Sequence, residues 1–316
     1  MTIIGENNSL PAGSVIATIG SFDGVHRGHH FVFSHLTRQA RRRGLQSAVV
    51  TFHEHPQHVL RPTDNPLPLL TTTDEKLALL RDTGIDHVIL LHFTPSLAAL
   101  SAAEFMQLLH SRYGVAALLT GYNHHFGHGS DDSRENYAAI GRQVGVDVIQ
   151  APEFQDESSL KISSSNIRRL LLQGNVTQAA SLLGRHYALT GTVEPGQHLG
   201  ATLGFPTANV AVADATKLIP AHGAYAAIAT TDTGTEYAAM VNIGVRPTVD
   251  DRGERVSIEA HLIHFSGDIY GRQLTVRFVE RLRDEVKFSS VERLTEQLGF
   301  DRRHTELIIQ KLKAST

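Results

Sequence analysis

The chain contains the stretch Val15-Ile16-Ala17-Thr18-Ile19-Gly20-Ser21-Phe22-Asp23-Gly24-Val25-His26-Arg27-Gly28-His29. Its first five residues are apolar or β-branched, which predicts a buried strand, and the periodic pattern from Phe31 to Arg43 predicts a helix. A glycine-rich turn between a strand and a helix places backbone N–H groups and a helix N-terminus at the carboxyl edge of a sheet. This stretch therefore predicts an α/β sheet with an anion-binding site at its edge.

The same alternation of strand and helix continues to about Ala151. Short and nearly continuous apolar runs are typical of parallel strands that are buried on both faces. These runs are Val15–Ile19, Ser47–Phe52, His87–Phe93, Val115–Thr120 and Val146–Gln150, and the helical stretches are Phe31–Arg43, Asp74–Asp82, Ala102–Ser111, Asp132–Val144, Asn166–Leu172 and Thr177–Leu183. Strands that alternate with helices predict a doubly wound, Rossmann-like α/β sheet.

The pattern changes after Gly184, where short stretches with alternating or β-branched residues are separated by turn residues. They are Tyr187–Val193, Ala224–Thr230, Tyr237–Asn242, Val256–Ile263 and Leu274–Glu280. Five or six short strands at this spacing predict an antiparallel β-barrel of the Greek-key type. A final helix is expected over about Ser290–Lys313 and closes the chain. We therefore expect two domains, residues 1–185 and 186–316.

The composition fits a globular protein that is large enough for two cores. The chain has 316 residues, of which 41% are hydrophobic and 19% charged, and its net charge of −3 argues against a general nucleic-acid binder. The absence of cysteine excludes disulfides, thiolate catalysis and cysteine-type zinc sites. No apolar run reaches the ~18 residues of a membrane span, and the first residues do not resemble a secretory signal. We expect a cytoplasmic protein without a membrane or nucleic-acid partner.

The glycine-rich loop carries residues that suit a phosphate group. Gly20, Gly24 and Gly28 allow the backbone to approach an anion closely, and His26 and His29 can donate to phosphate oxygens as charge develops during nucleotidyl transfer. The alternative is a glycine turn with two surface histidines, which is the commoner meaning of a short histidine motif. The length of the motif and its position directly after a strand favour the phosphate site.

A second segment, Lys161-Ile162-Ser163-Ser164-Ser165-Asn166-Ile167-Arg168, also suits a triphosphate. It places hydroxyl groups at a predicted helix start and the guanidinium of Arg168 one turn later, near free backbone N–H groups. The alternative is a serine N-cap followed by a solvated arginine.

A different phosphate motif appears in the predicted barrel, at Gly196-Gln197-His198-Leu199-Gly200-Ala201-Thr202-Leu203-Gly204-Phe205-Pro206-Thr207-Ala208-Asn209. Its glycines permit close backbone approach, Pro206 stiffens the loop, and Thr207 and Asn209 offer the oxygen ligands that Mg²⁺ prefers. The alternative is a tight turn that enters a strand. Two phosphate motifs on one chain indicate an enzyme that uses ATP twice.

Strand alternation also places Glu259 and His261 on one face of a predicted barrel strand. Phosphoryl transfer to a hydroxyl group needs an acceptor for the hydroxyl proton, and a carboxylate is one type of acceptor. The alternative is an outward-facing glutamate on a barrel strand.

These motifs resemble those of a known family. The first motif resembles the signature of the nucleotidyltransferase superfamily, and the serine-rich segment resembles its second motif with Ser165 in place of threonine. Together with Thr51-Phe52-His53-Glu54-His55-Pro56, Leu70-Thr71-Thr72 and Gly121-Tyr122-Asn123-His124-His125-Phe126-Gly127, they resemble bifunctional bacterial FAD synthetase over nearly the whole chain. That family joins an FMN adenylyltransferase to a riboflavin kinase, so the resemblance implies riboflavin, FMN, FAD and ATP as ligands and Mg²⁺ as cofactor.

The resemblance also implies roles for individual residues. For the adenylyltransferase it implies ATP binding by Gly20, Phe22, Asp23, His26, Gly28, His29, Ser164 and Arg168, and flavin binding by Phe52, His55, Pro56 and Asn123. For the kinase it implies ATP binding by Gly200, Gly204, Pro206, Thr207 and Asn209, metal binding by Thr207 and Asn209, and flavin binding by Arg246, Arg283, Glu285 and Phe288. The catalytic candidates are His26 and His29 for adenylyl transfer and Glu259 for the kinase.

The chain departs from the family pattern at three places. His53-Glu54 stands where relatives usually have Asp-Pro, His125 where many have arginine, and Ala201 where they usually have arginine or lysine. We expect His125 to make FAD formation weaken above about pH 7, since histidine is only partly cationic there. We expect Ala201 to raise the KM for ATP of the kinase. His124, His125 and His128 lie close in the sequence, but without carboxylates in register they form a weak metal-ligand set.

Other functions remain open at this stage. The first is a single-activity adenylyltransferase whose barrel only binds flavin, and the second is a non-catalytic flavin carrier or flavin-sensing module. A class I aminoacyl-tRNA synthetase would need a Lys-Met-Ser-Lys-Ser-like loop and an anticodon domain, which the sequence lacks. The sequence is compatible with an oligomer and does not determine the oligomeric state.

Overall fold

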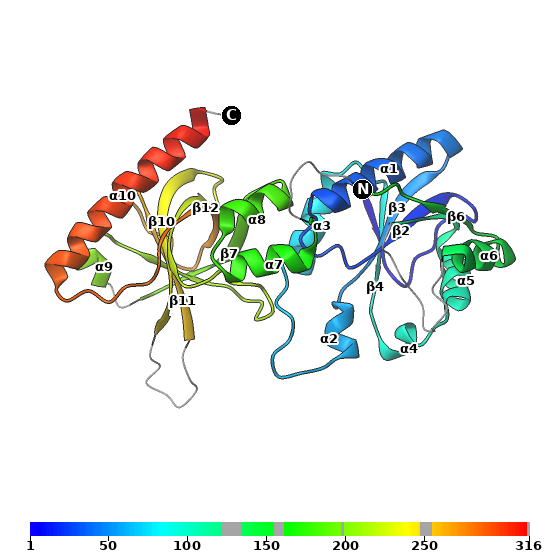
Figure 1. Ribbon diagram of the computed structural model, residues 1–316, viewed down its shortest axis with the longest axis horizontal. Helices are drawn as coiled ribbons and strands as arrows, with labels where there is room; N and C mark the ends of the chain where they lie inside the picture. The colour runs from blue at the N-terminus through cyan, green and yellow to red at the C-terminus, as the bar shows by residue number, and fades with distance from the viewer. Residues whose placement is uncertain (122–133, 155–160, 197–198, 247–254, 315–316) are drawn as a thin grey trace. The chain divides into compact units, whose positions relative to one another are not determined.

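The computed structural model describes residues 1–121, 134–154, 161–196, 199–246 and 255–314, and the chain folds into two compact units, Met1–Ile162 and Ser163–Thr316 (Figure 1). In the first unit the strands are β1 (Thr2–Ile4), β2 (Val15–Ile19), β3 (Gln46–Phe52), β4 (His87–Leu91), β5 (Val115–Thr120) and β6 (Asp147–Gln150). The helices are α1 (Arg27–Arg43), α2 (Pro56–Leu60), α3 (Thr73–Arg81), α4 (Pro95–Ala98), α5 (Ala102–Tyr113) and α6 (Arg134–Val144).

The six strands of the first unit form one parallel sheet in the order β1-β4-β3-β2-β5-β6. The chain runs outward from β2 through β3 and β4, and then returns to the other side of β2 with β5 and β6. The strand order therefore reverses beside β2, and in open α/β sheets ligands bind at the carboxyl ends of the strands at such a point. The prediction of a doubly wound sheet is confirmed.

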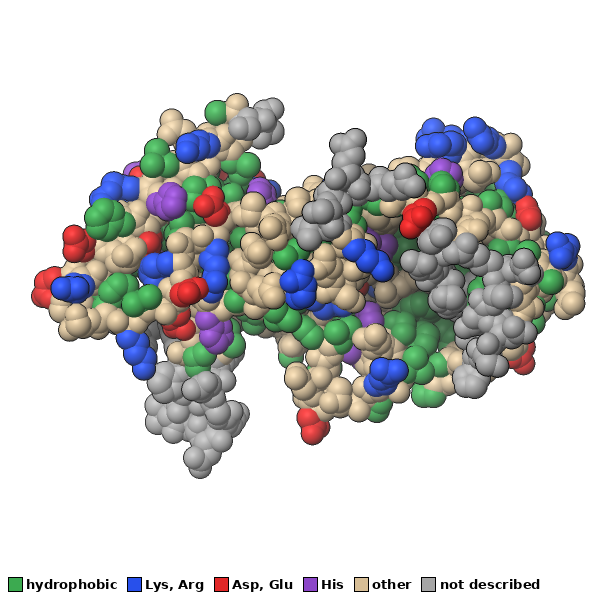
Figure 2. All heavy atoms as spheres, in the orientation of Figure 1, with side chains coloured by type: hydrophobic (Ala, Val, Ile, Leu, Met, Phe, Trp, Pro, Cys, Tyr) green, Lys and Arg blue, Asp and Glu red, His purple; other side chains and the backbone are tan. Residues whose placement is uncertain are grey.

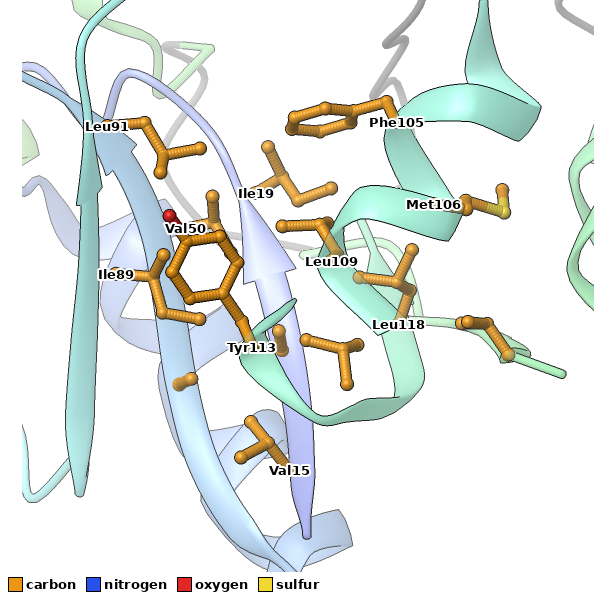
Figure 3. Packing of buried hydrophobic residues seen from close by; sticks show 14 of the residues in the cluster. Val15, Ile19, Val50, Ile89, Leu91, Phe105, Met106, Leu109, Tyr113 and Leu118 are labelled. Carbon is orange, nitrogen blue, oxygen red and sulfur yellow. The ribbon is translucent and has the colours of Figure 1, made fainter. Parts of the chain in front are cut away.

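Both faces of this sheet are covered by helices, because its strands are apolar on both sides. Val15 and Ile19 of β2 pack toward α5, while the intervening Ile16 packs toward Phe33 and Leu36 of α1. Figure 3 shows Leu109 and Tyr113 of α5 pointing toward the strands that carry Ile19 and Val50.

The second unit contains helices α7 (Ser164–Leu172) and α8 (Val176–Leu183), the barrel strands, and α10 (Val291–Ala314). Its strands are β7 (Tyr187–Glu194), β8 (Ala208–Ala211), β9 (Gly223–Thr231), β10 (Glu236–Arg246), β11 (Arg255–Leu262) and β12 (Gln273–Arg283), and a short helix, α9 (Leu199–Thr202), precedes β8. The strands close into an antiparallel barrel in the order β10-β11-β8-β7-β12-β9, which confirms the predicted barrel.

Helices α7 and α8 belong to the same compact unit as the barrel. Thr177 of α8 donates its hydroxyl to the Val279 carbonyl of β12 at 3.1 Å, and the Ala221 N–H donates to the Leu171 carbonyl at 3.0 Å. The predicted domain boundary, between residues 185 and 186, lies after both helices. The position at which the two catalytic domains divide remains a prediction. Among the described residues, no helix is both long enough and apolar enough to cross a membrane.

We predict that Leu109→Ala lowers the free energy of unfolding by about 2–5 kcal/mol. Leu109 is fully buried against the sheet, so the shorter side chain loses burial and leaves a cavity. Urea unfolding monitored by circular dichroism measures the change. Leu172→Ala is the control, because that leucine is 54% exposed; equal losses in the two variants would contradict the prediction.

Candidate functional site

The loop after β2 has an unusual backbone conformation. Phe22, Gly24 and Val25 have positive φ angles of 49°, 82° and 39°. Two of these three residues carry a Cβ, so the conformation is unfavourable unless surrounding contacts hold it, and such residues concentrate at functional sites. At Gly28 a Cβ would lie 3.2 Å from the His26 ring, so the glycine allows the loop to turn closely into α1.

His26 and His29 cap the N-terminus of helix α1 and form hydrogen bonds with each other. The His29 N–H donates to His26 Nδ1 at 3.3 Å, the His26 N–H donates to His29 Nδ1 at 3.3 Å, and the two rings are stacked with centroids 3.5 Å apart. Because each Nδ1 accepts a hydrogen bond, the proton of each neutral ring lies on Nε2. Both rings are thereby fixed as Nε2–H donors at a helix N-terminus. Phe22 supports them from one side, with its ring 5.1 Å from that of His29.

Asp23 fixes the loop to the segment that precedes α3. Its carboxylate is buried and accepts the Leu70 N–H at 3.0 Å, the Thr71 N–H at 3.0 Å and the Thr71 hydroxyl at 3.2 Å. The Thr71 hydroxyl oxygen also accepts the Gly24 N–H at 3.1 Å. These contacts give Asp23 a structural role within the motif, in addition to the nucleotide contact that the resemblance implies.

A buried lysine, which sequence reasoning missed, joins the ends of two strands. Lys76 of α3 donates its Nζ to the Phe52 carbonyl at 2.7 Å and to the Ser21 carbonyl at 3.4 Å. Burial lowers the pKa of Lys76 to about 8, although the Asp23 and Glu54 carboxylates act in the opposite direction. No local signal in the sequence separates Lys76 from an exposed helical lysine, because its burial depends on distant segments.

A pocket of about 400 Å³ opens at the carboxyl ends of β2 and β3. Figure 2 shows a hollow with hydrophobic side chains in the first unit. Four predicted site residues line this pocket, Gly20, Phe52, His55 and Pro56, together with Ser21 of the glycine-rich motif. The lining also includes residues that the sequence analysis did not predict, namely Phe93, Leu97, Leu100 and Phe105. His26 and His29 are not among the lining residues of this pocket, whereas Gly20 and Ser21 of the same loop are.

The unusual His53-Glu54 pair ties the two walls of this pocket together. The Glu54 carboxylate accepts the Phe93 N–H at 2.9 Å and contacts His92 Nδ1 at 2.8 Å, and the His53 ring stacks on the His92 ring with centroids 4.3 Å apart. The connection after β3 and the connection after β4 are therefore held to each other by side chains.

Three predicted site residues, Ser164, Arg168 and Asn123, are not placed beside this pocket by the described structure. Ser164 and Arg168 lie on α7 in the second unit, so their predicted meeting with the glycine-rich loop stays a prediction. Asn123 lies outside the described residues, as do His124, His125 and His128.

The barrel contains a second pocket, of about 320 Å³. It brings together six residues that the sequence singled out: Gly200, Thr207, Glu259, Arg283, Glu285 and Phe288. Arg246 ends β10. Helix α10 contributes a wall of this pocket that the sequence analysis did not predict, made of Leu294, Leu298 and Asp301. The helical pattern of these residues does not indicate which distant loop they face.

The proposed catalytic carboxylate lies beside the glycine-rich segment of the barrel. The Thr207 hydroxyl donates to Glu259 Oε2 at 3.4 Å, and Glu259 of β11 pairs with Asn209 of β8 in the sheet register. The pairing of β8 with β11 therefore brings together three oxygen-bearing side chains from segments about 50 residues apart. A Cβ on Gly200 would lie 2.4 Å from the Phe205 carbonyl oxygen, so this tight turn requires glycine.

His261 supports the same segment from β11. Its Nδ1–H donates to the Pro206 carbonyl at 2.8 Å, and its ring meets that of Phe205 edge to face at 5.4 Å. Burial lowers the pKa of His261, although its hydrogen bond to Pro206 acts in the opposite direction. The imidazole is therefore a neutral donor that holds the loop before Thr207.

The group that could hold a metal is made of oxygen atoms. Thr207, Asn209 and Glu259 supply a hydroxyl, an amide carbonyl and a carboxylate, the donor types that hard divalent cations prefer. Within the described part of the chain, no group of three or more histidine, aspartate or glutamate side chains is arranged to hold a metal ion by itself.

We predict that the free energy of unfolding of the wild type rises between about pH 8 and pH 10.5 relative to that of Lys76→Met. The pKa of Lys76 is lowered in the folded protein to about 8 from 10.5, so over this range the unfolded chain binds the proton and the folded chain does not. The cost of burying the ammonium is present in full below pH 8, and raising the pH relieves it. Urea unfolding at pH 7, 8, 9 and 10 measures the difference, and parallel profiles for the two proteins would refute it.

Comparison with known proteins identifies a family for each half of the chain. The model of the FAD synthetase family matches residues 9–166, and the model of the riboflavin kinase family matches residues 183–309. The chain is 36% identical to the bifunctional riboflavin kinase/FMN adenylyltransferase of Pseudomonas fluorescens, over 90% of each chain. It is 35% identical to the protein of the same description from Escherichia coli strain K12, over 93% of this chain and 92% of the other.

A solved structure shares the same fold over nearly the whole length. It is described as a macrolide-efflux protein from Streptococcus pneumoniae, is 33% identical, and matches with a TM-score of 0.84 over 96% of this chain and 98% of its own. The family models and the full-length relatives together show that the chain belongs to the family of bifunctional riboflavin kinase/FMN adenylyltransferases.

Proposed function

We propose that the chain makes FAD in two ATP-dependent steps and that each step uses one of the two pockets. Riboflavin is phosphorylated at its ribityl 5′-hydroxyl in the barrel pocket, which gives FMN and ADP. FMN is then adenylylated at the edge of the parallel sheet, which gives FAD and pyrophosphate. The observation that carries the proposal is the contact between Thr207 and Glu259 in the barrel pocket, where a candidate base lies beside a phosphate-binding loop.

In the kinase step, Glu259 accepts the proton of the ribityl hydroxyl as that oxygen attacks the γ-phosphate of ATP. The turn formed by Gly200 and Gly204 approaches the phosphates, and His261 holds that turn in place through the Pro206 carbonyl. Thr207 and Asn209 have the oxygen donors to hold Mg²⁺, which would neutralise phosphate charge. The flavin ring then lies on the side of the pocket where Arg283, Glu285 and Phe288 are found.

In the adenylyl-transfer step, the Nε2–H donors of His26 and His29 stabilise the charge that develops on the α-phosphate and on the departing pyrophosphate. Their Nδ1 atoms are already engaged with backbone N–H groups, so both rings keep their orientation during the reaction. Phe52, His55 and Pro56 bind the flavin in the pocket at the ends of β2 and β3. Ser164 and Arg168 add donors to the triphosphate.

The finer assignments belong to the same proposal. The catalytic domains divide between residues 185 and 186. The match to the riboflavin kinase model, which begins at residue 183, supports this boundary. The enzyme works in the cytoplasm, in keeping with its lack of cysteine and with substrates that are small metabolites. A single-activity adenylyltransferase is the second candidate, because Ala201 replaces the cation that the family usually carries in its kinase loop.

We predict that Glu259→Gln and His29→Ala separate the two activities. Glu259→Gln removes the proton acceptor, so the kcat for FMN formation falls by about 100-fold or more while FMN adenylylation is unchanged. His29→Ala removes one donor, so FAD formation from FMN falls by about 100-fold while the kinase is unchanged. Chromatography of products from riboflavin, or from FMN, with MgATP measures both.

Two neighbouring residues provide matched controls for that experiment. Glu280→Gln changes an exposed carboxylate on β12, and His30→Ala changes the exposed histidine that follows His29. Both variants should retain both activities. A wild-type protein that makes FAD from FMN but no FMN from riboflavin would establish the second candidate instead.

We predict that Ala201→Arg lowers the KM for ATP of the kinase by about tenfold. Ala201 is exposed on α9 at the glycine-rich segment, so an arginine there has room to reach a phosphate and adds a charge-assisted contact. Initial rates at varied ATP concentration measure the effect. Ala201→Met, which adds length without charge, should leave the KM unchanged, and an unchanged KM in the arginine variant would contradict the role assigned to this position.

A further inference from the structure

Helix α10 contributes a buried carboxylate to the barrel pocket. Asp301 is only 5% exposed and lies among the residues that line this pocket. Burial of a carboxylate is costly unless it is paired and hydrogen-bonded. The contacts that Asp301 makes therefore indicate what the residue is for.

Both oxygens of Asp301 have defined partners. Oδ2 accepts the Nε–H of Arg283 at 2.9 Å, and Oδ1 accepts an N–H of the Gln297 amide at 2.8 Å. Arg283 ends strand β12, whereas Asp301 lies about three turns into α10, so the ion pair joins the last barrel strand to the closing helix. This Arg283–Asp301 pair is partly shielded from water, with side-chain exposures of 19% and 7%.

The same arginine carries one wall of the pocket. The guanidinium carbon of Arg283 lies 5.5 Å from the centre of the Phe288 ring, and Arg283 Nη1 donates to the Asp284 carbonyl at 3.2 Å. Arg283 thus contacts the connection between β12 and α10 at two places. Three residues of this connection, Glu285, Val286 and Phe288, line the pocket although they lie in neither a helix nor a strand.

Residues 284–287 of this connection are exposed, so packing alone fixes the wall weakly. Val286 is 52% exposed. A Cβ on Gly244 would lie 2.4 Å from Glu285 Oε1, so Glu285 lies close to the bare backbone of β10. An arginine side chain has many rotamers, so ordering it costs conformational entropy. A carboxylate held by Gln297 on a packed helix orients the guanidinium before a ligand arrives.

We propose that Asp301 is a positioning residue for riboflavin, acting through Arg283 and Phe288 on the flavin side of the barrel pocket. This inference rests on the proposed function, because it assumes that riboflavin occupies this pocket. Asp301 does not contact the reacting groups in this role. It sets the affinity for the flavin by holding the Arg283–Phe288 wall in its binding position.

The test compares riboflavin affinity in Asp301→Asn, Arg283→Met and the double variant, with Kd measured by quenching of riboflavin fluorescence. Each single change should raise the Kd about tenfold, the effect of losing one charge-assisted hydrogen bond. The double variant should bind no more weakly than Arg283→Met alone, because Asp301 acts only through Arg283. The KM for ATP should stay within twofold, and FMN adenylylation should be unchanged.

A matched control is the ion pair between Arg277 of β12 and Glu236 of β10. Glu236→Gln breaks the exposed pair between Arg277 Nη2 and Glu236 Oε1, 2.5 Å apart, whose residues do not line the pocket, and it should leave riboflavin affinity unchanged. Gln297→Met keeps the ion pair and removes only the second hydrogen bond of Asp301. It should raise the Kd two- to threefold, and it serves as the test if Asp301→Asn does not fold.

The outcomes separate this inference from the proposed function. The inference is overturned if riboflavin affinity is unchanged in Asp301→Asn, if the KM for ATP rises by the same factor, or if the two single effects multiply in the double variant. If the wild type binds riboflavin but forms no FMN, the kinase function fails while the binding comparison still decides the role of Asp301. If the wild type does not bind riboflavin, both proposals fail.

Discussion

The first site depends on one constraint: a loop with positive φ angles at residues that carry side chains must be held by buried polar contacts. Asp23 supplies them on one side by accepting three hydrogen bonds from Leu70 and Thr71. Lys76 supplies them on the other side by donating to the Ser21 and Phe52 carbonyls. The motif is therefore held by contacts within the protein, and its helix N-terminus and imidazoles are presented at the reversal point of the sheet.

The second site follows the same physical rule with different elements. A closed barrel has no free strand edge, so the chain positions its polar groups by register and by the closing helix. Register pairs Glu259 with Asn209, and His261 holds Pro206 next to Thr207. Asp23, Lys76 and His261 are buried, Thr207, Asn209 and Glu259 are half-buried, and their partners come from distant segments. Such networks are costly when they are incomplete, which gives each site a single well-defined geometry.

The sequence predicted the long, strongly patterned elements well. The strand Val15–Ile19 has the predicted bounds, and the final helix begins and ends one residue later than predicted. The elements that were missed are short: β1 (Thr2–Ile4), β8 (Ala208–Ala211) and three helices of four or five residues. A hydrophobic period cannot be read from so few residues, and these strands form because a longer strand is already in place to pair with them.

The sequence by itself determined the fold class and most of the chemistry, because phosphate-binding loops and their donors are local strings whose spacing is set by the backbone. Tertiary structure alone decided which charged residues are buried. Lys76 and Asp301 lie in helices whose local patterns are those of ordinary surface residues, yet both are enclosed by segments that fold against them from elsewhere in their own unit. Burial is a property of the assembled core, so the two residues that we find holding the pocket walls could be identified only from the folded chain.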